Sequence, residues 1–143
     1  MAEWLKSIQN SSYLSHFTEK KGSLTGELRW NGILISVEID ISPDVEEMQL
    51  NISVAEELLS AATLWKSRLD EHLLRSLLGQ TWIESEGAQL APDELLSKVK
   101  LLEVVIEEGE FSFWHSDGGL YYGHSIVVHG NIADGIKMVM APM

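Results

Sequence analysis

The dipeptide Asn31-Gly32 lies between two runs of alternating apolar and polar residues, and this pattern constrains the fold more than any other. A type I′ turn needs positive φ at both central positions, which Asn and Gly tolerate. With a two-residue turn, Trp30 faces Ile33 and Leu28 faces Ile35, so apolar side chains share one side. The pattern therefore predicts an antiparallel hairpin with one face in the core and one in solvent.

A long amphipathic helix is predicted over about residues 54–78, where apolar side chains recur at steps of three and four. Ser53 and Glu56 have the spacing of a capping box, and Gly79 is a natural C-terminal stop. We expect this helix to pack on the sheet. Its spare apolar flank consists of Leu64, Leu74 and Leu78.

The C-terminal part of the chain has the period of strands. A turn at Glu108-Gly109 places Ile106 opposite Phe111. A second turn at Gly118-Gly119 would pair Phe113 with His124 and His115 with Tyr122, which puts His124 on the apolar face. Together with shorter helices, including one that starts at Pro92, these elements predict a single α+β domain over 1–143. We expect about six antiparallel strands with the helices packed on one face.

Charge is unevenly distributed along the chain, which has 10 Lys+Arg against 22 Asp+Glu and a formal net charge of -12. No basic residue lies between Arg29 and Lys66, or between Lys100 and Lys137. Such an acidic field repels nucleic acid and speeds association with a basic protein, although acidity also serves solubility. The predicted contacts with a basic partner are Glu38, Asp40, Asp44, Glu46 and Glu47, followed by Glu107, Glu108 and Glu110.

No catalytic constellation is recognisable in the sequence. The absence of cysteine excludes thiolate chemistry, and no histidine pair has the spacing of a zinc site, so we predict neither a metal nor a cofactor. A histidine on an apolar strand face is more often a core residue than a catalyst. The alternative, an enzyme or small-ligand site, would use His115, Asp117, Tyr122 and His124.

The stretch from Trp114 to Ile126 resembles a bacterial family that is known only as a domain of unknown function. Its matching features are Asp117-Gly118, the strand Tyr122-Gly123-His124-Ser125-Ile126 and the later Asp134-Gly135. The predicted helix and Trp82 are also similar to that family. The resemblance implies no activity, but small acidic proteins of this kind look like the immunity partners of bacterial toxins.

The sequence therefore predicts a non-catalytic acidic binding protein, an immunity or antitoxin-like inhibitor of a basic toxin. A structural oligomer subunit that uses the spare flank of the long helix is a further alternative. No segment approaches the 18 or so apolar residues of a membrane span, and the N-terminus lacks a signal peptide pattern. We accordingly expect a cytoplasmic protein that binds neither membrane nor nucleic acid.

Overall fold

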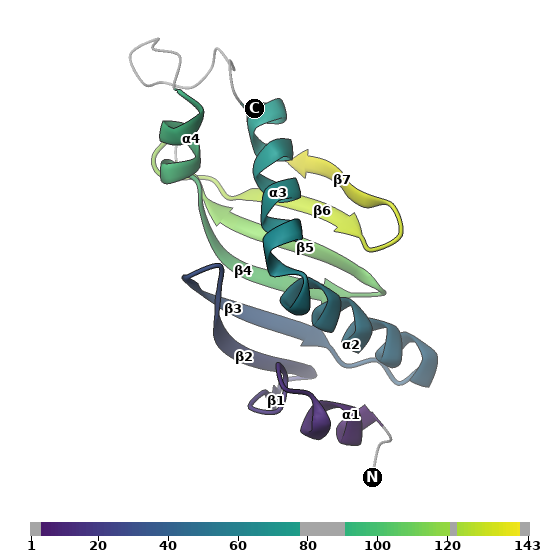
Figure 1. The fold of residues 1–143 in the computed structure, drawn as a ribbon. Helices are drawn as coiled ribbons and strands as arrows, with labels where there is room; N and C mark the ends of the chain where they lie inside the picture. Colours follow the sequence, from purple (N-terminus) through teal and green to yellow (C-terminus); the bar gives the residue numbers. More distant parts are fainter. Residues whose placement is uncertain (1–3, 78–90, 121–122, 141–143) are drawn as a thin grey trace.

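A computed structural model of the chain describes residues 4–77, 91–120 and 123–140 (Figure 1). These residues form a mixed seven-stranded sheet with four helices, so the α+β class is confirmed. The strands lie side by side in chain order, and every neighbouring pair is antiparallel except β3 and β4, which run parallel. The strands are β1 (Thr18–Lys20), β2 (Ser23–Trp30), β3 (Ile33–Asp40), β4 (Lys100–Glu107), β5 (Glu110–Ser116), β6 (Ile126–Asn131) and β7 (Gly135–Met140).

The predicted sheet of about six antiparallel strands was therefore incomplete in two ways. The short edge strand β1, which pairs with β2, was not expected. The sheet also contains a parallel seam, in which Val37 pairs with Val104 and Ile39 with Ile106. Three helices connect β3 to β4, and a long crossover of this kind is what allows two strands to run parallel.

Two of the three predicted two-residue hairpins have the expected register. Trp30 pairs with Ile33 and Ile106 with Phe111. Asn31 and Gly32 have φ of 53° and 81°, as a type I′ turn requires. Glu108 and Gly109 adopt nearly the same backbone, with φ of 52° and 74°, although glutamate lacks the tolerance of asparagine for this conformation.

The predicted long helix is in fact two helices, α2 (Val45–Ser60) and α3 (Ala62–Leu77). The expected start at Ser53 was wrong, because the N-cap is Asp44, whose carboxylate accepts the backbone N–H groups of Glu46 and Glu47. The remaining helices are α1 (Trp4–Asn10) and α4 (Pro92–Lys98). The proline at the start of α4 was anticipated.

The break between α2 and α3 is held by the β2–β3 hairpin. The indole Nε1 of Trp30 donates to the carbonyl oxygen of Leu58 at 2.9 Å, and Nδ2 of Asn31 donates to that of Ala62 at 3.0 Å. The carbonyl of Leu58 belongs to the last turn of α2, where the helical ladder ends, so it needs a partner from outside that helix. The two helices thereby take different paths: α2 contacts β3, β4 and β5, whereas α3 contacts β7.

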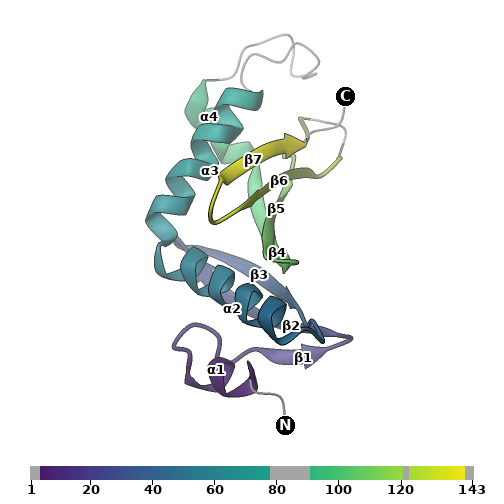
Figure 2. The ribbon, with the colours of Figure 1, turned by 90° about the vertical axis from the view of Figure 1, so that its right-hand side faces the viewer.

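The core lies between these helices and one face of the sheet, as Figure 2 shows. The opposite face is open and carries mostly half-buried and exposed side chains, both polar and apolar. Its exposed apolar residues are Leu34, Leu102, Trp114, Met138 and Met140. Of the predicted helix flank, Leu64 is exposed, Leu74 packs partly against the core, and Leu78 lies outside the described residues.

Candidate functional site

The parallel seam brings the two acidic segments of the sequence to one end of the sheet. Because β3 and β4 run in the same direction and Ile39 pairs with Ile106, the strands end side by side at Asp40 and Glu107. The helix α2 begins just after β3, and the β4–β5 turn follows β4 at once. The acidic end, as we call it, lies on the right in Figure 1. It comprises the predicted contacts Glu38, Asp40, Asp44, Glu46, Glu47, Glu107, Glu108 and Glu110.

These carboxylates surround the end of the sheet rather than occupying one flat face. Alternation along the strands places Glu38, Asp40, Glu107 and Glu110 on the open side, since their neighbours in sequence are buried on the helix side. The others belong to the first turn of α2 and to the β4–β5 turn. A partner would therefore meet negative charge from several directions.

Asn51 of α2 fixes the geometry of this end. It is fully buried, its Nδ2 donates to the carbonyl oxygen of Asp40 at 3.0 Å, and its Oδ1 accepts the N–H of Gly109 at 2.8 Å. One amide thus joins the end of β3 to the β4–β5 turn. Gly109 also lies against Leu50, whose Cδ2 would come within 2.4 Å of an added Cβ.

A few cations border the acidic end. The Nζ atom of Lys137 lies 3.7 Å from a carboxylate oxygen of Glu110 and 3.5 Å from one of Asp134. Lys20 and Lys21 lie in the β1–β2 turn beside the end of β3. Exposed pairs of this kind contribute little to stability, and the acids outnumber the lysines, so the end stays negative.

Crowding of carboxylates extends along the open face. Glu103 of β4 has a raised pKa because it is partly buried and because the carboxylate of Glu38 on β3 repels its charge. This carboxyl therefore stays protonated to a higher pH than an isolated glutamate. A positive group from a partner would relieve the repulsion.

The alternative site predicted near the C-terminus is not assembled as expected. The register Phe113–His124 was wrong: Phe113 pairs with Val128 and His115 with Ile126, so a loop separates β5 from β6. His124 is exposed in that loop rather than part of the core. Tyr122 lies outside the described residues.

Asp117 explains why the loop is longer than a two-residue turn. Its Oδ1 accepts the N–H of Gly119 at 2.9 Å and its Oδ2 accepts that of Gly123 at 2.8 Å. The carboxylate is buried and organises the loop. Gly118 packs so closely on α4 that an added Cβ would lie 2.2 Å from the carbonyl oxygen of Lys98.

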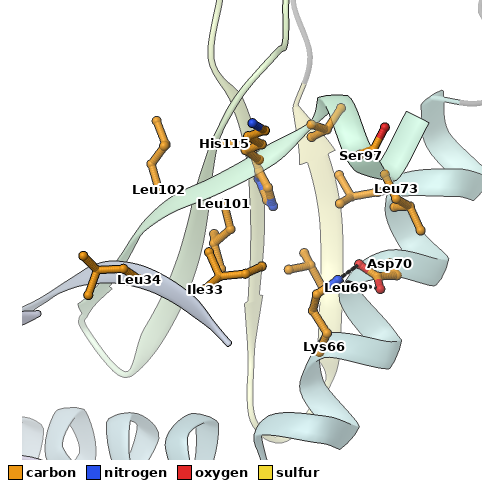
Figure 3. Close-up of a pocket in the computed structure, with 13 residues that line it drawn as sticks. Ile33, Leu34, Lys66, Leu69, Asp70, Leu73, Ser97, Leu101, Leu102 and His115 are labelled. Atoms are coloured by element: carbon orange, nitrogen blue, oxygen red, sulfur yellow. Dashed lines mark hydrogen bonds and ion pairs between the residues drawn. The ribbon is translucent and has the colours of Figure 1, made fainter. Parts of the chain in front are cut away.

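The fourth residue of that predicted site, His115, lines a cavity of about 420 Å³ at the opposite end of the seam (Figure 3). The cavity lies between α3, α4 and the first residues of β3 and β4. Leucine, isoleucine and valine side chains form most of its wall. Its polar residues are Lys66, Asp70, Ser97, Lys100 and His115.

The imidazole of His115 is almost completely buried, with 2% of its residue surface exposed. Its Nδ1 lies 3.2 Å from the carbonyl oxygen of Ile126, which can only accept, so Nδ1 carries the proton. Burial lowers the pKa of His115 to about 4, and the neighbouring Lys66 acts in the same direction. The ring is therefore neutral at pH 7, with a bare lone pair on Nε2.

Within 4–77, 91–120 and 123–140, no group of three histidine or carboxylate residues is placed to hold a metal ion. Lys66 and Asp70 form an ion pair one helical turn apart at the cavity wall. None of the helices in this part of the chain is long and apolar enough to cross a membrane.

Sequence reasoning missed Asn51, the Lys66–Asp70 pair and the burial of His115. The last of these had a signal, because Phe111, Phe113 and His115 alternate along one strand and share its core face. The role of Asn51 had no signal in the sequence, since its hydrogen-bond partners are backbone groups of Asp40 and Gly109, which are distant along the chain.

A family model described as an uncharacterized protein conserved in bacteria (DUF2262) matches residues 13–140. Neither a curated protein nor a solved structure matched the chain.

Proposed function

The chain belongs to this uncharacterized bacterial family, DUF2262, and we propose that it is a non-catalytic protein that binds a basic protein partner through its acidic end. The observation that carries the proposal is the parallel seam, which joins two acidic segments that are far apart in sequence. Complementary charge of this kind raises association rates and disfavours wrong partners. The finer proposal is an immunity-type inhibitor that covers the basic site of a toxin.

The rigidity of the acidic end supports this proposal. Asn51 ties the β4–β5 turn to the end of β3, and Asp44 caps α2 from within the same surface. Because the backbone beneath these carboxylates is already held, a partner has to order only their side chains when it binds. Glu108 at the tip of the turn is held with positive φ and is exposed.

The proposal is tested by pull-down and binding kinetics against the product of the neighbouring gene, at low and at moderate salt. We expect binding that weakens as salt screens the exposed carboxylates. The variant Glu107→Gln/Glu108→Gln/Glu110→Gln should reduce the affinity about tenfold at low salt, mainly through a slower association rate.

A matched control has the same change in charge at exposed positions away from the acidic end: Glu27→Gln/Glu71→Gln/Asp93→Asn. This variant should bind nearly as the unmodified chain does. Equal loss in both variants, or binding that is indifferent to salt, would contradict a contact through the acidic end.

A further inference from the structure

The cavity beside His115 has two features that lie away from the acidic end and that a protein bound there would not contact. It is large enough for a small organic molecule, since ligand pockets are typically about 300–1,000 Å³. It also borders the imidazole of His115, whose Nε2 is itself buried and receives no hydrogen bond from any group among the described residues. A buried polar atom without a partner is costly, so it points to a ligand that supplies one.

The direction of this unsatisfied group is favourable. Figure 3 shows the imidazole of His115 extending from β5 toward α3, where Leu69 and Lys66 lie. Because Nδ1 is already bonded to the carbonyl of Ile126, the ring cannot turn Nε2 away without losing that bond. The acceptor is thus fixed in place.

The charges around the cavity restrict what the ligand can be. A cationic donor would face Lys66 and Lys100, which Asp70 alone offsets. A carboxylate would place its oxygen lone pairs against the lone pair of Nε2. An uncharged hydroxyl or N–H donor meets neither obstacle.

The apolar wall specifies the rest of the molecule. Leu69, Leu73, Val99 and Leu101 are buried at the floor, whereas Leu102 and Ser97 are exposed at the mouth. We propose that this cavity binds a small, mainly apolar molecule that donates one uncharged hydrogen bond to Nε2 of His115. This site is independent of the acidic end, which lies at the other end of β3 and β4.

The test uses two probes that share a body and differ in the donor: 2-naphthol and 2-methoxynaphthalene. Titration of the full chain by ¹H–¹⁵N NMR should show saturable shifts at residues that line the cavity. We expect 2-naphthol to bind about tenfold more tightly, the gain typical of one hydrogen bond to a buried acceptor. Its binding should also shift the imidazole Nε2 resonance.

The variant His115→Phe keeps an aromatic ring but removes the acceptor, and it should bind both probes with equal affinity. His124→Phe is the matched control, because that exposed histidine lies outside the cavity and its loss should leave the tenfold preference intact. Circular dichroism reports whether each variant is folded.

Should His115→Phe fail to fold, Ser97→Trp fills the mouth of the cavity from an exposed position and should weaken both probes at least tenfold. Equal affinity of the unmodified chain for the two probes, no saturable binding, or full binding by Ser97→Trp would each overturn the proposal.

Discussion

The two ends of the β3–β4 seam differ in how their charged groups are arranged. At the acidic end, eight carboxylates are gathered, and five of them are exposed to solvent, which screens their charge. At the cavity end, the Lys66–Asp70 pair offsets its own charge and His115 is neutral. Exposed charges stay hydrated and need no partner, whereas a buried group such as the imidazole of His115 is costly to charge. The two ends are therefore suited to different kinds of partner.

The largest expected effect concerns the packing of the cavity end. Gly118→Ala should destabilise the fold by about 4 kcal/mol, because its Cβ would meet the backbone of Lys98 and its φ of 62° already disfavours a side chain. Gly119→Ala, with φ of 87° but open space around it, should cost only about 1 kcal/mol. Urea unfolding measures both, and equal losses would contradict the close contact with α4.

A pH titration of stability separates His115 from the carboxylates. An unfolded histidine titrates near 6.5, whereas burial lowers the pKa of His115 to about 4. Above pH 6.5 both states are neutral. As pH falls from 6.5 to 4, only the unfolded state takes up the proton, so the folded state loses up to about 3 kcal/mol, and the loss is constant below pH 4.

The difference in unfolding free energy between the unmodified chain and His115→Phe isolates the contribution of His115, because both chains contain the same carboxylates. Unfolding followed from pH 4 to 7.5 should show a shallower slope in the variant, and parallel curves would contradict a buried neutral imidazole. His124→Phe, at an exposed position, should keep the original slope.

At the acidic end, the largest loss should come from the buried amide. Asn51→Ala leaves the N–H of Gly109 without its acceptor and should destabilise the fold by about 2 kcal/mol. Amide exchange of Gly109 should accelerate in parallel. Asn131→Ala, which removes bonds within the exposed β6–β7 turn, should cost clearly less, and the reverse order would contradict the joining role of Asn51.

The smallest expected effect is an increase in the stability of the fold. Glu108→Asn should stabilise the fold by about 0.5 kcal/mol, because asparagine tolerates the φ of 52° that Asn31 adopts in the other hairpin. Glu108→Gln removes the same charge at the same position without the change in backbone preference. The melting temperature of Glu108→Asn should exceed that of Glu108→Gln, and equal melting temperatures would attribute the gain to charge alone.

The hairpins were predictable because their determinants are local. A two-residue turn with glycine and the alternation beside it set the register of β2–β3 and of β4–β5. The start of α2 had a local signal too: Asp44 precedes Glu47 by three residues, the same spacing that made Ser53 attractive. Of these two signals, the structure uses Asp44, and Ser53 lies inside α2.

The parallel seam and the sites at its ends could not be predicted in this way. Nothing near Val37 indicates that Val104 will pair with it, because the pairing depends on how three intervening helices pack. The acidic positions are visible in the sequence, but their convergence at one end of the sheet depends on the seam. Similarly, the Gly118-Gly119 pair fits a tight turn, and the buried carboxylate of Asp117 lengthens it instead.

The seam also has a consequence for the order in which the chain folds. On each side of it, β1–β3 and β4–β7 are sets of sequence neighbours, so each can form from contacts that are close along the chain. The pairing of β3 with β4 must instead close across the whole helical segment, at a much larger loss of chain entropy. We therefore expect the seam to form last. Until it does, a newly made chain has neither the acidic end nor the complete cavity, and both form in the same final step.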